Sequence, residues 1–361
     1  MTEIAGSPLS NRRIASLDAF RGFIMFSMLL HTFGLSKLSH VPVVGFIYSQ
    51  LRHVPWVGFH FEDIILPSFL FIIGVSMELS ESARIQRGDA PEVRFGHAMK
   101  RVGTLFGLGF LLSWISAGKP TIGPGVLQVL ALSYFFGYMV VRRSLPVRFA
   151  VAVGLLFFYW FFIYVIPVPG AGRNSYVVYK NLVYFIDNTI TGSTSRWGYL
   201  YTIITSVAVI IYGSIVANLL RTRTSNRRFM SILALFGIVG IVNGLVLHPV
   251  IPIIKRMFTS SYTLFACGLI SILYLGFFWL MEEKNLRKWS FPFIVIGMNS
   301  IFIYMLNGLF RRWLVTTAGV FINPLEPVIG AWIYPACEFA RIAALWLVCF
   351  WLYRRKIFFK I

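Results

Sequence analysis

LRHVPWVGFHFEDIILPSFLFIIGVSM, residues 51–77, sets ionisable side chains directly before an apolar run. That run, 61–81, has about the 20 residues that a helix needs to cross a membrane core of about 30 Å. His53, Glu62 and Asp63 stand at its start. An ionisable group beside hydrocarbon costs several kcal/mol unless it has a partner. The stretch therefore predicts a membrane helix whose mouth carries a hydrogen-bond network or a reacting group.

The composition extends this prediction to the whole chain. Of 361 residues, 57% are hydrophobic and only 13% are charged, and the mean hydropathy is +0.75, whereas soluble domains have about 25% charged residues. Apolar runs of spanning length lie at 17–36, 61–81, 99–117, 124–142, 147–167, 197–219, 229–248, 260–281, 290–310 and 336–353. The sequence predicts an all-α polytopic membrane protein, a bundle of about ten transmembrane helices that forms a single domain over 1–361.

The distribution of basic residues predicts the orientation. Of the 33 lysines and arginines, 21 fall in one alternating set of polar segments and 10 in the other. The richer side is cytoplasmic by the positive-inside rule, which places both termini there and the 51–60 loop outside. The net charge of +20 follows largely from this topology, so it does not indicate a nucleic-acid partner. The polar N-terminus, 1–13, shows no cleavable signal, and the segment 313–334, interrupted by prolines, is expected to lie in the interface or to re-enter.

Two pairs of basic residues on the outer side abut predicted span ends: Lys255 with Arg256, and Arg311 with Arg312. Such side chains can reach lipid phosphates, or they can line an anion-binding cavity. Both interpretations stay open from the sequence. The three cysteines, Cys267, Cys337 and Cys349, lie in apolar runs without metal-ligand spacing, so no metal site is predicted.

His53 is the first catalytic candidate, because an imidazole exchanges protons near neutral pH. It begins the motif HxxWxGxxxxD, which continues through Trp56, Gly58 and Asp63. Asp63 or Glu62 could orient the ring, as a base requires. The alternative is a loop histidine that caps a backbone group, with Asp63 stabilising a helix N-terminus.

Polar residues also occur within or at the ends of the predicted spans. Asp18 and Arg21 are three residues apart at the start of the first span, where they form an ion pair or hold a ligand. Four further candidates are Gln128, Asn299, Tyr304 and Asn307. These four either join helices by hydrogen bonds or line a substrate cavity.

Five segments resemble one family in the right order. They are SLDAFRG (16–22), HVPWVGFHFEDIILPSFLFIIGVSM (53–77), GVLQVLALSYF (125–135), IPIIKRMFTSSYTLFACG (251–268) and GMNSIFIYM (297–305). They are similar to segments of the heparan-alpha-glucosaminide N-acetyltransferase family. The resemblance covers a core of about 14–310 and leaves 311–361 as an interfacial segment and last span. Two positions depart from the family pattern, Val129 for an arginine and Asn307 for a histidine.

The resemblance implies acetyl transfer from acetyl-CoA to an amine of an amino sugar or saccharide on the far side of the membrane. His53 matches the family's active-site histidine, with Asp63 orienting it. Lys255 and Arg256 match a basic pair suited to CoA phosphates or to an anionic saccharide, and Asp18 and Arg21 are assigned to the cofactor end. Substrate contacts are expected from Trp56, Glu62, Gln128, Asn299, Tyr304 and Asn307. A homodimer and a bacterial inner-membrane location are also implied.

Three functions remain in competition at this point. The first is the acetyltransferase, with His53 as base or as acetyl carrier. The second is a transporter of a sugar or lipid-linked saccharide, although no inverted repeat is visible. The third is a membrane scaffold without activity. The P-loop, GxSxG, HExxH and CxxC signatures of other enzyme classes are missing from the sequence.

Overall fold

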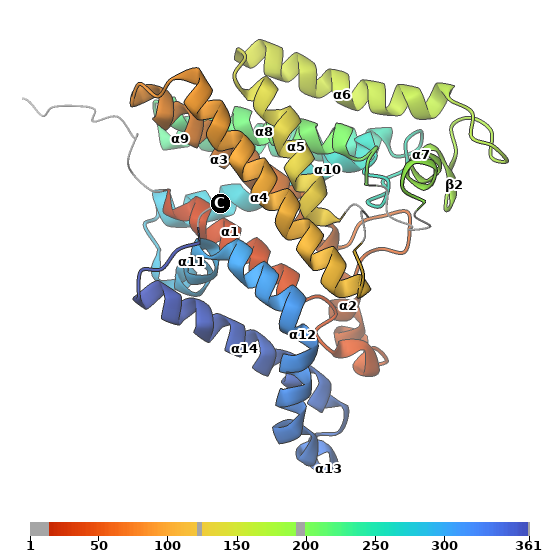
Figure 1. The fold of residues 1–361 in the computed structure, drawn as a ribbon, viewed down its shortest axis with the longest axis vertical. Coiled ribbons are helices and arrows are strands. Elements are labelled where there is room, and N and C mark those ends of the chain that lie inside the picture. The colour runs from red at the N-terminus through yellow and green to blue at the C-terminus, as the bar shows by residue number, and fades with distance from the viewer. Residues whose placement is uncertain (1–13, 121–124, 193–198, 360–361) are drawn as a thin grey trace, which may run out of the picture.

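The computed structural model describes residues 14–120, 125–192 and 199–359, and these are almost entirely helical (Figure 1). The longer helices are α1 Ala15–Leu29, α3 Ile65–Gln86, α4 Pro91–Ala117, α5 Val126–Val141, α6 Leu145–Val165, α8 Ile203–Arg221, α9 Asn226–Leu247, α10 Ser260–Phe278, α12 Ser300–Ile322 and α14 Ile333–Arg354. The shorter elements are α2 Pro42–Gln50, α7 Leu182–Thr191, α11 Phe291–Met298, α13 Glu326–Ile329, the helical turns η2 Leu35–Leu38, η3 Phe61–Ile64, η4 Trp279–Glu283, η5 Lys288–Ser290, η6 Asn323–Leu325 and η7 Gly330–Trp332, and the strands β1 Tyr176–Val177 and β2 Lys180–Asn181.

The all-α prediction is confirmed, and each of the ten predicted apolar runs contains a helix. Within the described residues, six stretches are long and apolar enough to cross a membrane: Phe61–Gln86, Leu145–Val165, Ile203–Arg221, Asn226–Leu247, Ser260–Glu283 and Ser300–Arg354. The last of these joins α12 to α14 through short turns. The count of ten crossings and the cytoplasmic position of the termini stay predictions.

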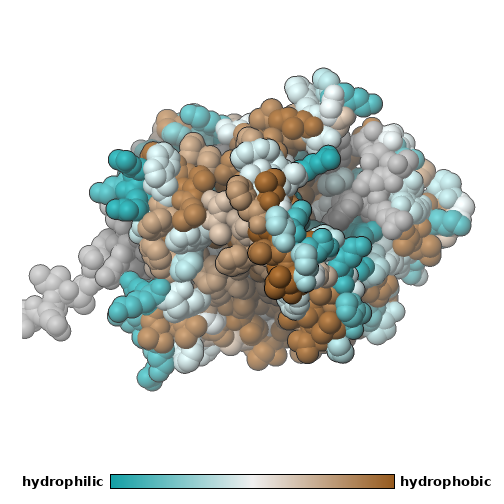
Figure 2. Space-filling model, turned by 90° about the horizontal axis from the view of Figure 1, so that it is seen from below, coloured by the Kyte–Doolittle hydropathy of each residue, from teal (hydrophilic) through white to brown (hydrophobic). Residues whose placement is uncertain are grey.

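Burial separates the central helices from the peripheral ones. The apolar windows of α3 and α8 are 72% and 67% buried, whereas those of α6 and α9 are only 17% and 22% buried. α6 exposes a row of aromatic rings that includes Phe149, Phe157 and Phe158. Figure 2 shows hydrophobic side chains over much of the middle of one face, with hydrophilic groups at its left edge and in a cluster to the right of the middle. Large exposed apolar surfaces of this kind are suited to contact with lipid.

The start of α1 and the end of α14 lie on the same side of the bundle, on the left in Figure 1, while α2 and α7 lie on the right. The loop before α3 belongs to the right-hand end. The start of α3 therefore lies at the right-hand end of the bundle, next to the loop that carries His53.

Three sequence expectations about helix limits are wrong. The run 17–36 continues past Leu29, where α1 ends, because the chain turns through positive φ angles at Thr32, Phe33 and Gly34. The run 290–310 is two helices, α11 and α12, separated at Asn299. α12 then continues to Ile322, so Arg311 and Arg312 lie within a helix and not at a span end.

α3 and α8 pack so closely that glycine is required at their crossing. A Cβ atom on Gly74 would lie 2.0 Å from the carbonyl oxygen of Ile210, and one on Gly213 would lie 2.3 Å from that of Phe71. Small residues permit this approach of helix backbones within membranes.

We expect Gly74→Ala to destabilise the protein by about 1–3 kcal/mol, because α3 and α8 must move apart. Thermal unfolding of the purified protein in detergent measures the change. Gly154→Ala on the peripheral α6 is the matched control, since a Cβ there meets nothing within 4 Å. Equal unfolding temperatures for the two variants would contradict the packing described for α3 and α8.

Candidate active site

The 51–60 loop is held in place by contacts to distant segments. The Trp56 indole Nε1 donates to the carbonyl of Tyr176 at 2.7 Å, which ties the loop to β1. The Gly58 N–H donates to the carbonyl of Ile253 at 2.9 Å. Gly58 has a φ of 117°, a conformation that favours glycine. The tryptophan and glycine of the motif thus fix the backbone that carries His53.

His53 and Asp63 form a hydrogen-bonded pair. The distance from His53 Nδ1 to Asp63 Oδ1 is 2.8 Å, and Asp63 is completely buried. The second carboxylate oxygen of Asp63 accepts the backbone N–H groups of His60 at 2.9 Å and Val54 at 3.3 Å. The Tyr262 hydroxyl donates to the Asp63 carbonyl at 2.6 Å. Asp63 therefore has a fixed position, and it holds the imidazole by one nitrogen.

This arrangement determines which nitrogen of His53 can react. Because an ionised carboxylate only accepts, Nδ1 carries the proton in the bond to Asp63, and Nε2 is the nitrogen with the basic lone pair. The His53 side chain is 23% exposed. Burial lowers the pKa of His53 below 6.5, and nearby Lys255 lowers it further, while the bond to Asp63 opposes both effects. The ring is consequently neutral and able to accept a proton at pH 7.

A second histidine and acid lie beside the pair. His31 Nδ1 is 3.0 Å from Glu62 Oε1, and the His31 and His53 rings are 5.7 Å apart. Glu62 is 5% exposed, and its Oε2 atom has no hydrogen-bond partner among the described residues. Sequence reasoning missed His31 because it falls within a predicted span, although the polar HTFG step at 31–34 marks the end of α1.

The cluster also bears on the prediction that the chain has no metal site. His31, His53 and Glu62 place one potential ligand atom each within 4.8 Å of the others. Imidazole and carboxylate ligands suit a divalent ion such as Zn²⁺. These three residues could hold such an ion, with Asp63 orienting His53 behind it.

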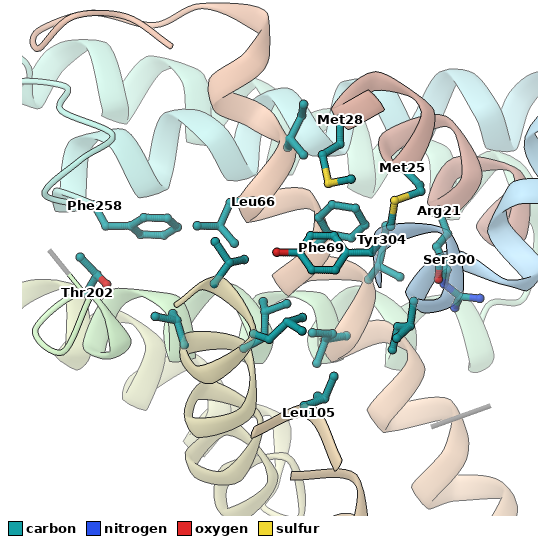
Figure 3. Close-up of a pocket in the computed structure, with 18 of the residues that line it drawn as sticks. Arg21, Met25, Met28, Leu66, Phe69, Leu105, Thr202, Phe258, Ser300 and Tyr304 are labelled. Carbon is teal, nitrogen blue, oxygen red and sulfur yellow. The ribbon is translucent and has the colours of Figure 1, made fainter. Parts of the chain in front are cut away.

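A cavity of about 390 Å³ opens from this cluster into the bundle. Its lining includes His53, Glu62, Lys255 and Arg256, and then mostly apolar side chains of α3, α4 and α5. Figure 3 shows it as an elongated space, with Phe258 and Thr202 near one end and Arg21 and Ser300 near the other. Tyr304 and Phe69 lie between them (Figure 3). Volumes of about 300–1,000 Å³ are usual for small-molecule sites.

Lys255 and Arg256 bring positive charge to the His53 end. They belong to the loop between α9 and α10 and line the cavity, and Lys255 is 5% exposed. Burial lowers the pKa of Lys255 to about 7, although Asp63 and Glu62 raise it in part. Its ammonium therefore gains or loses a proton close to neutral pH.

Arg21 stands at the opposite end of the cavity. Its guanidinium bonds Asp18 at 3.0 Å and the Ser76 hydroxyl at 3.0 Å. The ion pair expected from the spacing of Asp18 and Arg21 is present. Arg21 lines the cavity and Asp18 supports it from behind.

The remaining candidates are divided between cavities and structural contacts. Tyr304 lines the main cavity and, with Gln128, a neighbouring one of about 380 Å³. Gln128 Oε1 also accepts the Gly125 N–H at 3.0 Å. Asn299 bonds the backbone of Ile357 and Phe359. In the described part of the chain, Asn299 and Trp56 lie outside the lining of the main cavity.

Asn307 belongs to a separate buried network. Its Oδ1 accepts from Arg341 at 2.5 Å, and Arg341 also bonds Glu338 at 2.6 Å and the Leu29 carbonyl at 2.6 Å. Arg311 reaches the same glutamate at 2.9 Å. This network joins α1, α12 and α14, and sequence analysis did not foresee it because its residues are scattered over the chain.

The fold and the site define a polytopic helical membrane protein with a histidine–aspartate pair at the mouth of an internal cavity. The chain belongs to the heparan-alpha-glucosaminide N-acetyltransferase, catalytic, family, whose sequence model matches residues 13–244. It is 24% identical to the Homo sapiens protein named heparan-alpha-glucosaminide N-acetyltransferase, over 97% of this chain and 60% of the human one. The chain thus spans less than two thirds of that relative's length. It is an integral membrane protein of a transferase family, as the sequence predicted.

Proposed function

We propose that the protein transfers an acetyl group from acetyl-CoA to an amine of an amino sugar or saccharide across the membrane. The observation that carries the proposal is the His53–Asp63 pair at the mouth of a cavity that extends along α3. The donor enters from the cytoplasmic end and the acceptor from the outer end. Family membership supports this chemistry.

His53 is the proposed base. The acceptor ammonium first releases one proton to solvent. Nε2 of His53 then takes a second proton from the amine nitrogen as that nitrogen bonds to the thioester carbon. When the carbon–sulfur bond breaks, the thiolate of CoA takes up the proton from the imidazolium. Asp63 stabilises the imidazolium and fixes the ring. Transfer through an acetyl-histidine would use the same nitrogen, so both routes depend on the same pair.

The charged neighbours of His53 suit the acceptor. Glu62 lines the cavity at this end and has a buried carboxylate oxygen without a described hydrogen-bond partner, which an acceptor ammonium would supply. Lys255 and Arg256 lie at this same end, so we assign them to an anionic group of the saccharide or to the thioester oxygen. Tyr304 and Arg21 lie further along the cavity, where the acyl donor would extend.

Purified protein with labelled acetyl-CoA and a panel of glucosamine-ended saccharides tests the proposal. We expect label on an acceptor amine and release of CoA. Uptake of unmodified saccharide by proteoliposomes, with no acetylation, would instead support the transporter. Loss of activity after chelation, with recovery on adding Zn²⁺, would assign His31, His53 and Glu62 to a metal ion.

The pH dependence gives a sharper prediction for Lys255. Because His53 reacts as the neutral ring, the rate should fall as pH drops through its pKa, which lies below 6.5. Replacing Lys255 by Met removes a positive charge that lowers this pKa, so the acidic limb of kcat/KM should move to higher pH. Lys255→Arg keeps the charge and should leave the limb in place. An acidic limb that is unchanged in Lys255→Met would contradict this coupling.

A further inference from the structure

A second cavity, of about 450 Å³, lies at the end of α3 far from His53. Arg84, Arg94, Lys100 and Arg101 line it, and Glu81 is the single acid among its described lining residues. These residues come from the end of α3 and the start of α4. The mechanism proposed above makes no use of them.

The positive charge of this cavity is only partly neutralised. Arg94 bonds Glu81 at 2.5 Å, and Arg84 bonds Asp89 at 3.0 Å. Lys100 and Arg101 form no ion pair with a described carboxylate. The Nε atoms of Arg94 and Arg101 are buried without a hydrogen-bond partner in the described structure. Buried guanidinium donors in this state favour a ligand with several acceptor oxygens.

The basic cavity adjoins the reaction cavity at Arg101, which lines both. Two helices, α3 and α5, continue from one cavity into the other along a single face. On α3 the lining positions are 65, 66, 69, 72, 73 and 76, followed by 77, 80, 81 and 84. On α5 the positions 126, 127, 129 and 130 are followed by 134 and 138. Spacings of three and four residues keep these side chains on one helix face.

The chemical environments along this face follow an order that indicates which kind of ligand fits both cavities. The histidine–aspartate pair lies at one end, apolar side chains of α3 and α5 follow, and four basic residues lie at the other end. A molecule that fits it has a reactive group, a long uncharged arm, and a cluster of phosphates. Acetyl-CoA has these parts in this order.

We propose that the basic cavity binds the phosphorylated nucleotide end of the acyl donor, with Lys100 and Arg101 holding its phosphates. Arg94 and Arg84 complete the positive surface, and Arg101 also lies over the Tyr134 ring at 5.1 Å. This inference rests on the proposed acetyl-CoA donor. Under this proposal the basic cavity binds the acyl donor, whereas Lys255 and Arg256 lie at the His53 end, where the acceptor binds.

The test compares CoA with dephospho-CoA, which lacks the 3′-phosphate, by calorimetric titration of the full-length protein in detergent. We expect the wild type to bind CoA at least about tenfold more tightly, as hydrogen bonds to charged groups allow. Lys100→Gln and Arg101→Gln should each reduce this preference and raise the KM for acetyl-CoA. Arg143→Gln is the matched control, since Arg143 is exposed and lies outside the described lining.

A parallel titration with 3′,5′-ADP and with phosphatidylglycerol distinguishes the two sources of phosphate. Competition by 3′,5′-ADP that is lost in Arg101→Gln supports the proposal. Binding of the lipid alone to this cavity overturns it, as does equal affinity for CoA and dephospho-CoA in a protein that still transfers acetyl groups. Equal affinity in an active protein would leave the proposed acetyl transfer intact and remove only the basic cavity as the CoA site. A protein that binds no form of CoA would overturn both the acetyl transfer and the CoA site.

Discussion

Replacing His53 by Ala should reduce acetyl transfer by about 10²–10⁴-fold, the usual contribution of a general base. No other described imidazole ring is bonded to Asp63, since the ring of His31 is bonded instead to Glu62. The acceptor amine would therefore lose the group that takes its proton. Initial rates with labelled acetyl-CoA measure the change, at saturating concentrations of both substrates.

His40→Ala is the matched control for this variant, since it removes an exposed histidine from the same connection between α1 and α3. Affinity for CoA should be retained in His53→Ala, because the basic cavity lies at the other end of the bundle. A His53→Ala protein that folds, binds CoA and transfers acetyl groups at the wild-type rate would exclude His53 as base and as carrier.

Replacing Asp63 by Asn should have an effect of similar size, about 10²–10⁴-fold in rate. The carboxylate accepts three hydrogen bonds, from His53 and from the backbone at Val54 and His60. An amide offers one oxygen and one NH₂ group, so at least one of these bonds is lost, and both backbone bonds are lost if the NH₂ group replaces Oδ2. If the NH₂ group donates to Nδ1 of His53, the proton moves to Nε2 and the base is in the wrong tautomer.

A second measurement separates positioning of His53 from general damage. We expect the unfolding temperature of Asp63→Asn to fall, since a buried donor left unsatisfied costs about 1–3 kcal/mol. The acidic limb of its pH–rate profile should also move, because Asp63 raises the pKa of His53. Glu326→Gln makes the same change from carboxylate to amide at an exposed position and should alter neither quantity. A loss of stability with an unchanged pH profile would assign Asp63 a structural role only.

Much of this molecule follows from local sequence. Apolar length predicts the helices because a membrane core requires it, and every predicted run contains one. The spacing of Asp18 and Arg21 predicts their ion pair because both lie on one helix face. The order of His53 and Asp63 around a helix start predicts their proximity, since the intervening loop is short.

Other features depend on contacts between distant segments and could not be read from the chain. The end of α1 at Leu29 falls inside a run that is otherwise apolar, and only the short HTFG step at 31–34 marks it. The bonds of Asn299 to the chain end and of Asn307 to Arg341 connect residues far apart in sequence. The sequence did not predict the basic cavity. Its arginines fall in a segment predicted to be cytoplasmic, where the positive-inside rule already accounts for basic residues.

The central claim is that the acetyl group is taken from one face of the membrane and delivered at the other. Proteoliposomes that enclose a glucosamine-ended saccharide, with labelled acetyl-CoA supplied only at the face that carries the basic cavity, test it directly. The account predicts labelled product inside the vesicles and none with His53→Ala. Product that forms only when donor and acceptor are on the same side would contradict it.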